Sequence, residues 1–254
     1  MKVTFLGTGT STGVPQIGCD CSVCVSPDAR DKRTRSSVLV ETDTGLNILI
    51  DCGPDFYHQI LGQNSPALQA ALLTHSHYDH VGGIDDLRPY CKNGSFPVYC
   101  QNDVAHDLRT RVPYCFAKKL YPGVPTFDIT YVDPYVPFHI GEVCITPLEV
   151  MHHKPILGFK IENLAYITDC KTLPNRTIQT LKGIDTLIIN ALRIKPHPSH
   201  QSLAEALRVI EKIHPRVAYL THVSHQLGRH EDVSPILPEN VFLAYDGLQI
   251  FVKN

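Results

Sequence analysis

The chain lacks the features that mark membrane, secreted and nucleic-acid-binding proteins. In its 254 residues no apolar run approaches the ~20 residues that a membrane span needs. The 23 basic residues nearly balance the 25 acidic ones, leaving a formal charge of -2, so there is no general attraction to nucleic acid or to an anionic membrane. Residues 1–6 enter an apparent strand at once. We therefore expect no signal peptide and a cytoplasmic protein.

The chain also has no linker, low-complexity tract or internal repeat. A hydrophobic content of 43% and a charged content of 19% are typical of a globular protein. We expect one domain over residues 1–254, which is long enough for two packed layers and a substantial core.

Nine cysteines would suggest disulfides in a secreted protein, but cysteines in a reducing cytosol are more often metal ligands or buried apolar groups. Three of them form Cys19-x-Cys21-x₂-Cys24, a spacing at which three thiolates can wrap one Zn²⁺ and leave a fourth position. His225 is the candidate for that position. The remaining cysteines are interpreted as core or incidental residues: Cys52, Cys91, Cys100, Cys115, Cys144 and Cys170.

Short β-branched runs recur along the chain, and many are apolar on both alternations, which indicates strands buried on both faces. The expected strands are 3–6, 37–40, 47–50, 70–73, 98–100, 129–132, 143–148, 158–161, 165–168, 186–190, 217–220 and 241–243. Helical periodicity is clearest over 202–213 and weaker over 102–111 and 175–181. The pattern predicts an α/β (α+β) fold of two central sheets covered outside by helices.

Four metal-binding side chains fall within six residues in the run His75-Ser-His77-Tyr-Asp79-His80. Imidazole and carboxylate at this density suit Zn²⁺, Mn²⁺ or Fe²⁺. Six residues can serve two ions, because neighbouring side chains on an irregular loop point in different directions. Since strand ends on one edge of a sheet converge, ligand candidates at other strand ends should join this centre. They are Asp51, His152, His153, Asp169 and His222.

This order of motifs resembles the metallo-β-lactamase superfamily over nearly the whole chain. The resemblance implies an αβ/βα four-layer sandwich with a dinuclear metal site between the sheets. His153 competes with His152 for one ligand position, and the pattern Val-Met-His favours His152. Asp51 resembles the carboxylate that orients a ligand histidine. The ligands that the resemblance implies are His75, His77 and His152 for one ion, Asp79, His80 and His222 for the other, and Asp169 as the bridge.

Two such ions lower the pKa of a bridging water, present hydroxide as a nucleophile and neutralise charge on an ester or phosphoryl oxygen. Hydrolysis is therefore the expected reaction. The diiron oxidoreductases of the superfamily usually have Glu where His77 stands and carry a flavodoxin domain, which this chain lacks. Hydrolysis is thus preferred over oxygen chemistry.

The cysteine motif, the opening Gly7-Thr-Gly9 and the segment Thr221-His-x-Ser-His225-Gln narrow the resemblance to PhnP-type phosphodiesterases, which act on phosphoribosyl 1,2-cyclic phosphate. The resemblance implies two active-site ions, Mn²⁺ or Zn²⁺, with Asp79 counted as both ligand and catalytic residue. It implies that His200 is the general acid, which protonates the leaving oxygen while the bridging hydroxide attacks phosphorus. It also implies one structural Zn²⁺ bound by Cys19, Cys21, Cys24 and His225.

The expected partner is a small phosphodiester substrate, with no membrane, and a homodimer is left open. Arg88, Arg193 and Lys195 are candidate phosphate contacts. A tRNA 3′-processing nuclease shares the ligands but usually needs a basic arm, and the chain has no long Lys/Arg- and Gly-rich insertion. The near-neutral charge also argues against a nucleic acid partner. The motifs are compatible as well with a lactonase, a thioesterase or a non-catalytic metal-binding domain.

Overall fold

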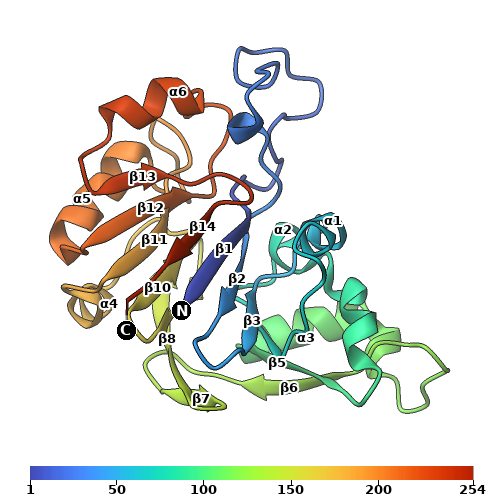
Figure 1. Cartoon of the computed structure of the whole chain (residues 1–254). Helices are drawn as coiled ribbons and strands as arrows, with labels where there is room; N and C mark the ends of the chain where they lie inside the picture. The colour runs from blue at the N-terminus through green and yellow to red at the C-terminus, as the bar shows by residue number, and fades with distance from the viewer. Residues whose placement is uncertain (254) are drawn as a thin grey trace.

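The computed structural model describes residues 1–253, which form two seven-stranded β-sheets packed face to face (Figure 1). In each sheet three neighbouring strand pairs are antiparallel and three are parallel. The first sheet has the order β14 (Gln249–Phe251), β1 (Lys2–Gly7), β2 (Ser37–Glu41), β3 (Asn47–Ile50), β4 (Ala70–Leu72), β5 (Phe96–Cys100) and β6 (Phe127–Tyr131). The second has the order β13 (Val241–Leu243), β12 (Val217–Thr221), β11 (Thr186–Asn190), β10 (Leu164–Ile167), β9 (Pro155–Ile161), β8 (Val143–Met151) and β7 (Phe138–Ile140).

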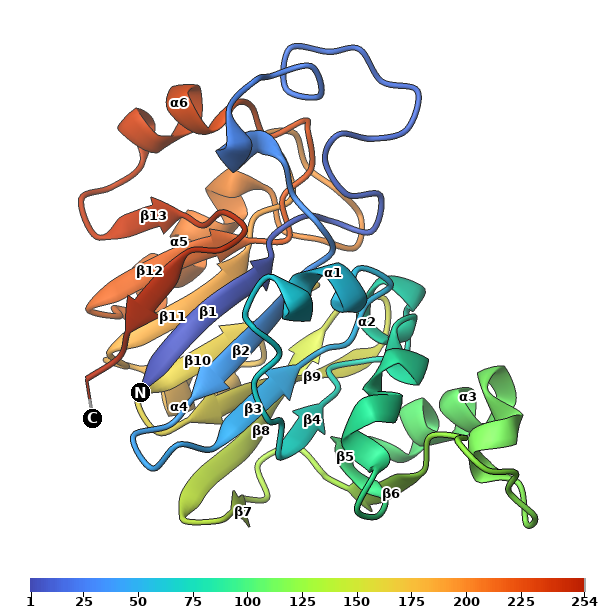
Figure 2. The ribbon, with the colours of Figure 1, turned by 45° about the vertical axis from the view of Figure 1, so that its right-hand side comes forward.

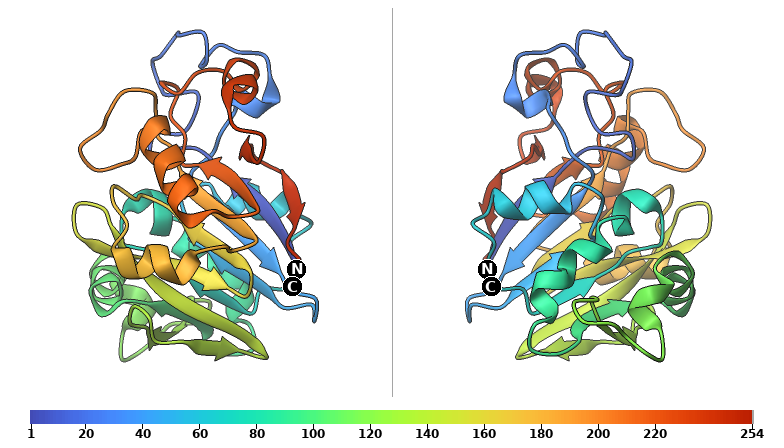
Figure 3. Two further views of the ribbon diagram at one scale, coloured as in Figure 1. Left: turned by 90° about the vertical axis from the view of Figure 1, so that its left-hand side faces the viewer. Right: turned by 90° about the vertical axis from the view of Figure 1, so that its right-hand side faces the viewer.

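Helices cover the outer face of each sheet, so the molecule has four layers (Figures 2 and 3). The helices on the side of the first sheet are α1 (Phe56–Leu61), α2 (Tyr78–Val81) and α3 (Asn102–Arg111). Those on the side of the second sheet are α4 (Asn175–Leu181), α5 (Leu203–Ile213) and α6 (His230–Val233). Short 3₁₀ helices lie at Ala29–Asp31, Ile84–Cys91, Pro113–Phe116 and Ser234–Ile236. Among the described residues, no helix has both the length and the apolar character needed to cross a membrane.

Three apolar cores hold these layers together. Phe5 of the first sheet and Phe159 and Tyr166 of the second belong to the core between the sheets, and all three are fully buried. Two further cores lie under the helices, one of them containing Leu49 of β3 and Phe56 of α1. Because both faces of the central strands are covered, their sequences are apolar on both alternations.

The predicted fold of two sheets with outer helices is confirmed, and each expected strand and helix is present. Two strands were not predicted, β7 and β14, which have three residues each and lie at sheet edges. Helices α1, α2 and α6 were also not predicted, because four to six residues are too few for helical periodicity to show. Helix α5 begins at a capping box, in which Ser202 and Glu205 bind each other's backbone N–H groups.

Candidate metal centre and active site

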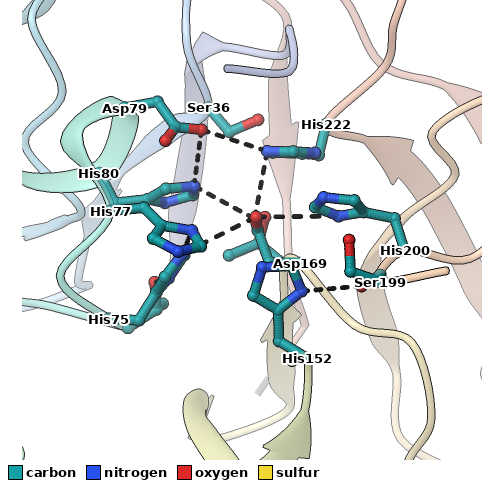
Figure 4. A network of polar contacts seen from close by, with 12 residues as sticks. Ser36, His75, His77, Asp79, His80, His152, Asp169, Ser199, His200 and His222 are labelled. Carbon is teal, nitrogen blue, oxygen red and sulfur yellow. Dashed lines mark hydrogen bonds and ion pairs between the residues drawn. The ribbon is translucent and has the colours of Figure 1, made fainter. Parts of the chain in front are cut away.

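The candidate site is assembled at strand ends from both sheets (Figure 4). Asp51 follows β3, Asp169 lies just beyond β10, and His222 follows β12. All three have positive φ angles, of 62°, 53° and 53°. A left-handed backbone at a non-glycine residue costs on the order of 1–3 kcal/mol and persists only where surrounding packing enforces it. Three such residues at one place are typical of a functional site.

Four buried residues form what we call the inner cluster: Asp79, His80, Asp169 and His222. The Nε2 atom of His80 lies 3.1 Å from Oδ1 of Asp169 and 3.3 Å from Oδ2 of Asp79. The Nε2 atom of His222 lies 3.2 Å and 3.5 Å from the same two oxygens. Their candidate ligand atoms all lie within 4.8 Å of one another, which is compatible with one shared ion.

The outer cluster consists of His75, His77, His152 and Asp169 and meets the same distance limit. The Nε2 atom of His75 lies 3.0 Å from Nδ1 of His77 and 3.8 Å from Oδ2 of Asp169. His77 and His152 are half-buried, in contrast to the inner cluster. The ring of His153 stacks on that of His77 at a centroid separation of 5.0 Å, but His153 is not a member of the cluster within residues 1–253. The geometry therefore favours His152 as the ligand.

The far nitrogens of three imidazoles are held by groups outside the clusters. Nδ1 of His80 lies 2.7 Å from Oδ2 of Asp51, the orienting contact predicted for this carboxylate. Asp51 also accepts hydrogen bonds from the backbone and hydroxyl of Thr74, whose Oγ1 lies 3.0 Å from Nδ1 of His75. Nδ1 of His152 lies 2.7 Å from the carbonyl oxygen of Ser199. These contacts orient the opposite Nε2 atoms toward the site.

Thr74 and Ser199 were not predicted from the sequence to belong to the site. The position of Thr74, between a buried strand and the ligand run, was a signal for its role. Ser199 acts through its backbone carbonyl, which no side-chain pattern can show. Asn190 is the last residue of β11, and its side chain binds the backbone N–H and C=O of Cys170 at 2.7 Å and 3.1 Å. It therefore fixes the backbone directly after Asp169.

The charges of the site suit a cation. Burial raises the pKa of Asp169, but His222 and His80 outweigh that effect and hold it well below its usual value. Burial also opposes ionisation of Asp79, and His80 and His222 again keep its pKa low. Burial lowers the pKa of His75 well below its usual value, so this imidazole is neutral and has a free lone pair. Burial lowers the pKa of His80, but the carboxylates of Asp169, Asp79 and Asp51 outweigh that effect and raise it well above its usual value, so a metal ion would displace this proton. Carboxylates and neutral imidazoles are the donors that borderline divalent ions prefer.

Unsatisfied nitrogens support the same conclusion. In the described part of the chain, Nε2 of His80, Nε2 of His222 and Nδ1 of His200 are buried without a hydrogen-bond partner. Buried polar atoms are rarely left unpaired unless an ion or water satisfies them. The residues present therefore fit divalent metal ions.

His200, the residue expected to be the general acid, borders both clusters. Its Nδ1 lies 3.8 Å from Oδ2 of Asp169, and its ring centroid is 4.7 Å from that of His152 and 5.1 Å from that of His222 (Figure 4). Burial, reinforced by His222, lowers its pKa to about 3. The imidazole is thus neutral at pH 7 even though the carboxylate of Asp169 lies beside it.

A third cluster contains the cysteine motif. Nδ1 of His225 lies 3.3 Å from Sγ of Cys19 and 3.2 Å from Sγ of Cys21, and Cys24 completes the group. The hydrogen bond with His225 lowers the pKa of Cys21 to about 6, whereas burial raises the pKa of Cys24 to about 11. All nine cysteines are free thiols. The structure thus brings together the four residues predicted to bind zinc.

Two of the three candidate phosphate contacts, Arg88 and Arg193, are engaged within the protein. The guanidinium of Arg88 binds Asp85 and the carbonyl of Gly123. That of Arg193 binds Gln226 and nearby backbone carbonyls, including that of Lys195. Because both guanidinium groups are engaged within the protein, we assign them structural roles.

Residues 46–223 match the family described as Beta-lactamase superfamily domain. The chain therefore belongs to the beta-lactamase superfamily, and the predicted αβ/βα sandwich is the fold of that superfamily. Within it, the chain is similar to a protein whose crystal structure is described as that of a new diphosphatase from the PhnP family. The two share 36% sequence identity and superpose with a TM-score of 0.91, over 98% of this chain and 96% of that one. The predicted PhnP-like resemblance is confirmed.

Two curated relatives have names that do not mention a phosphatase. An octanoyltransferase of Porphyromonas gingivalis is 44% identical over 254 residues, which cover 99% of this chain and 52% of that protein. The chain thus spans about half the length of this relative. Coenzyme PQQ synthesis protein B of Methylorubrum extorquens is 36% identical over 220 residues, covering 75% of this chain and 72% of the relative. Superfamily membership therefore does not by itself identify the substrate.

Proposed function

We propose that this protein is a metal-dependent phosphodiesterase that hydrolyses a small cyclic ribose phosphodiester. The observation that carries the proposal is the pair of clusters that share Asp169, with His200 beside both. The likeness to a PhnP-family diphosphatase supports chemistry at a phosphorus–oxygen bond. A cytoplasmic location, where thiols stay reduced, is part of the proposal.

The inner and outer clusters would each hold one divalent ion, Mn²⁺ or Zn²⁺, and Asp169 would contact both. The third cluster, Cys19, Cys21, Cys24 and His225, would hold a structural Zn²⁺. When bound, the two active-site ions activate water and neutralise negative charge on a phosphoryl oxygen.

The protein's own residues prepare the site in two ways. Asp51, Thr74 and the carbonyl of Ser199 orient the imidazoles of His80, His75 and His152 before any ligand arrives. Burial of the inner cluster excludes bulk water and strengthens electrostatic interactions with a bound anion. The geometry therefore costs little reorganisation when the substrate reacts.

His200 is the proposed general acid. The negative charge of a phosphodiester would raise its pKa from the low value that burial imposes. The resulting imidazolium would protonate the departing ribose oxygen and return to the neutral state.

The test is metal analysis combined with parallel assays of a cyclic ribose phosphate, a generic aryl phosphodiester and a pre-tRNA. We expect two ions per chain besides the structural zinc and hydrolysis of the small phosphodiesters. A single active-site ion with no hydrolysis in Mn²⁺ or Zn²⁺ would contradict the proposal. Cleavage of pre-tRNA alone would favour a tRNA-processing nuclease.

A second candidate function is hydrolysis of a carboxylic ester or thioester. The relative named octanoyltransferase favours it, because that name implies an acyl substrate for the whole relative. A metal centre that polarises a phosphoryl oxygen can also polarise a carbonyl. Octanoyl esters and thioesters should therefore be assayed beside the phosphodiesters, and a much higher kcat/KM for them would replace the first candidate.

A further inference from the structure

One face of α3 contacts the two loops that carry the histidines of the outer cluster. Asp103, Asp107 and Arg111 are spaced four residues apart and so share this face. Asp107 accepts a hydrogen bond from the hydroxyl of Ser76, and Arg111 donates one to the carbonyl of Ser76. Asp103 forms an ion pair with Lys154 at 2.6 Å. We call Asp103, Asp107 and Arg111 the α3 brace.

Ser76 links the brace to His77. It lies between His75 and His77, is buried, and has both its hydroxyl and its carbonyl bound by α3. That carbonyl belongs to the peptide unit joining Ser76 to His77. The hydrogen bond from Arg111 therefore fixes the orientation of the peptide plane that precedes His77. On its other side, the carbonyl of His77 accepts the backbone N–H of His80 at 3.0 Å. The His77 backbone is therefore held from both directions.

Lys154 links the same helix to His152. The backbone N–H of His152 donates to the carbonyl of Lys154 at 3.0 Å, closing a tight turn, and the Lys154 side chain pairs with Asp103. The two side chains of this ion pair are 37% and 49% exposed, and such pairs contribute little. Asp107 and Arg111 should therefore carry most of the effect of the brace.

The inner cluster is held differently, by full burial and by the contact of Asp51 with His80. We propose that the α3 brace sets the affinity of the outer cluster for its ion, without touching that ion. Asp107 and Arg111 are thus positioning residues that act through the Ser76 peptide. This inference rests on the two-ion site proposed above, and it adds a structural control of the outer ion that the inner cluster does not share.

The test is metal titration of the metal-depleted protein by calorimetry, with Zn²⁺ and with Mn²⁺, and metal content measured after dialysis. Asp107→Ala and Ser76→Ala should each weaken one active-site ion about tenfold, the lower end for loss of a group that orients a ligand. The double variant should be no weaker than Asp107→Ala, because both changes break one contact. His106→Ala, on the exposed side of the same helix, is the matched control and should bind as the unmodified protein does.

Reference variants identify which ion is affected. The binding step that Asp107→Ala and Ser76→Ala weaken should be absent from the titration of His77→Ala and present in that of His222→Ala. The inference would be overturned if Asp107→Ala weakened the binding of both ions equally. It would also be overturned if neither Asp107→Ala nor Ser76→Ala weakened the binding of any ion. Ser76→Ala, which removes one oxygen atom, decides the matter if Asp107→Ala fails to fold. If the unmodified protein binds only one active-site ion, it is the proposed function that fails.

Discussion

The inner and outer clusters share Asp169 but differ in their burial and in the number of carboxylates they contain. The inner cluster contains two carboxylates and two imidazoles, all buried, whereas the outer one adds three imidazoles, two of them half-exposed. Attraction between a cation and two carboxylates in a buried environment is strong. One half of the site is therefore buried and rich in carboxylate, which favours retention of an ion, and the other half is more open to solvent. Filling of the inner cluster should therefore precede filling of the outer one.

The largest effect should come from removing the shared residue. Asp169→Asn deprives both clusters of an ionised carboxylate that His222 and His80 keep charged. We expect loss of both active-site ions and a fall in kcat/KM of roughly 10⁴-fold, or about 5 kcal/mol. Metal analysis and steady-state kinetics measure this, with circular dichroism as the check on folding. Retention of two ions with high affinity would show that the clusters are independent.

His200→Ala should separate catalysis from metal binding, because His200 belongs to neither cluster. We expect kcat to fall by about 10²-fold or more, as for loss of a general acid, with both ions retained. The loss should be much smaller for an aryl phosphodiester, whose leaving oxygen needs no proton. An equal loss for both leaving groups would argue against the general-acid role.

Asp51→Ala tests how the inner cluster holds its ion. Asp51 contacts Nδ1 of His80 and the hydroxyl of Thr74. Its removal should weaken the inner ion by about 10- to 100-fold. Titration with Zn²⁺ should show this weakening, with a smaller weakening of the step absent from His77→Ala, because Asp51 also holds Thr74 beside His75. An effect confined to that outer step would reverse the assignment.

The smallest effect concerns proton release at the cysteine cluster. Zinc binds thiolates, and the pKa of Cys21 is about 6, so this thiol is mostly deprotonated at pH 7.5 and mostly protonated at pH 5. Zinc uptake should therefore release more protons, and be weaker, at pH 5. Calorimetry in two buffers of different ionisation enthalpy counts these protons. An identical count at both pH values would contradict the role of Cys21 as a ligand.

The ligand residues could be predicted because buried strands reveal where they end. Asp169 and His222 lie at the ends of runs that are apolar on both alternations, so the sequence shows both the strand and its polar terminus. The contacts of Ser199 and of the α3 brace could not be predicted. One uses a backbone carbonyl, and the other depends on which loop a distant helix meets after packing. Strands β7 and β14 were missed because three residues at a sheet edge carry little periodicity.

Each of the three clusters draws residues from both halves of the chain. Strands β1 to β6 build the first sheet in chain order and β7 to β13 build the second, with only β14 returning to the first. Asp79 comes from the first half and His222 from the second, and the same division separates Cys21 from His225. No cluster can be complete before the two sheets have met. Metal ions should therefore stabilise the packing of the two halves, and increasingly so as the ion concentration rises. We expect that chelation weakens this packing and that metal uptake is the last step of folding.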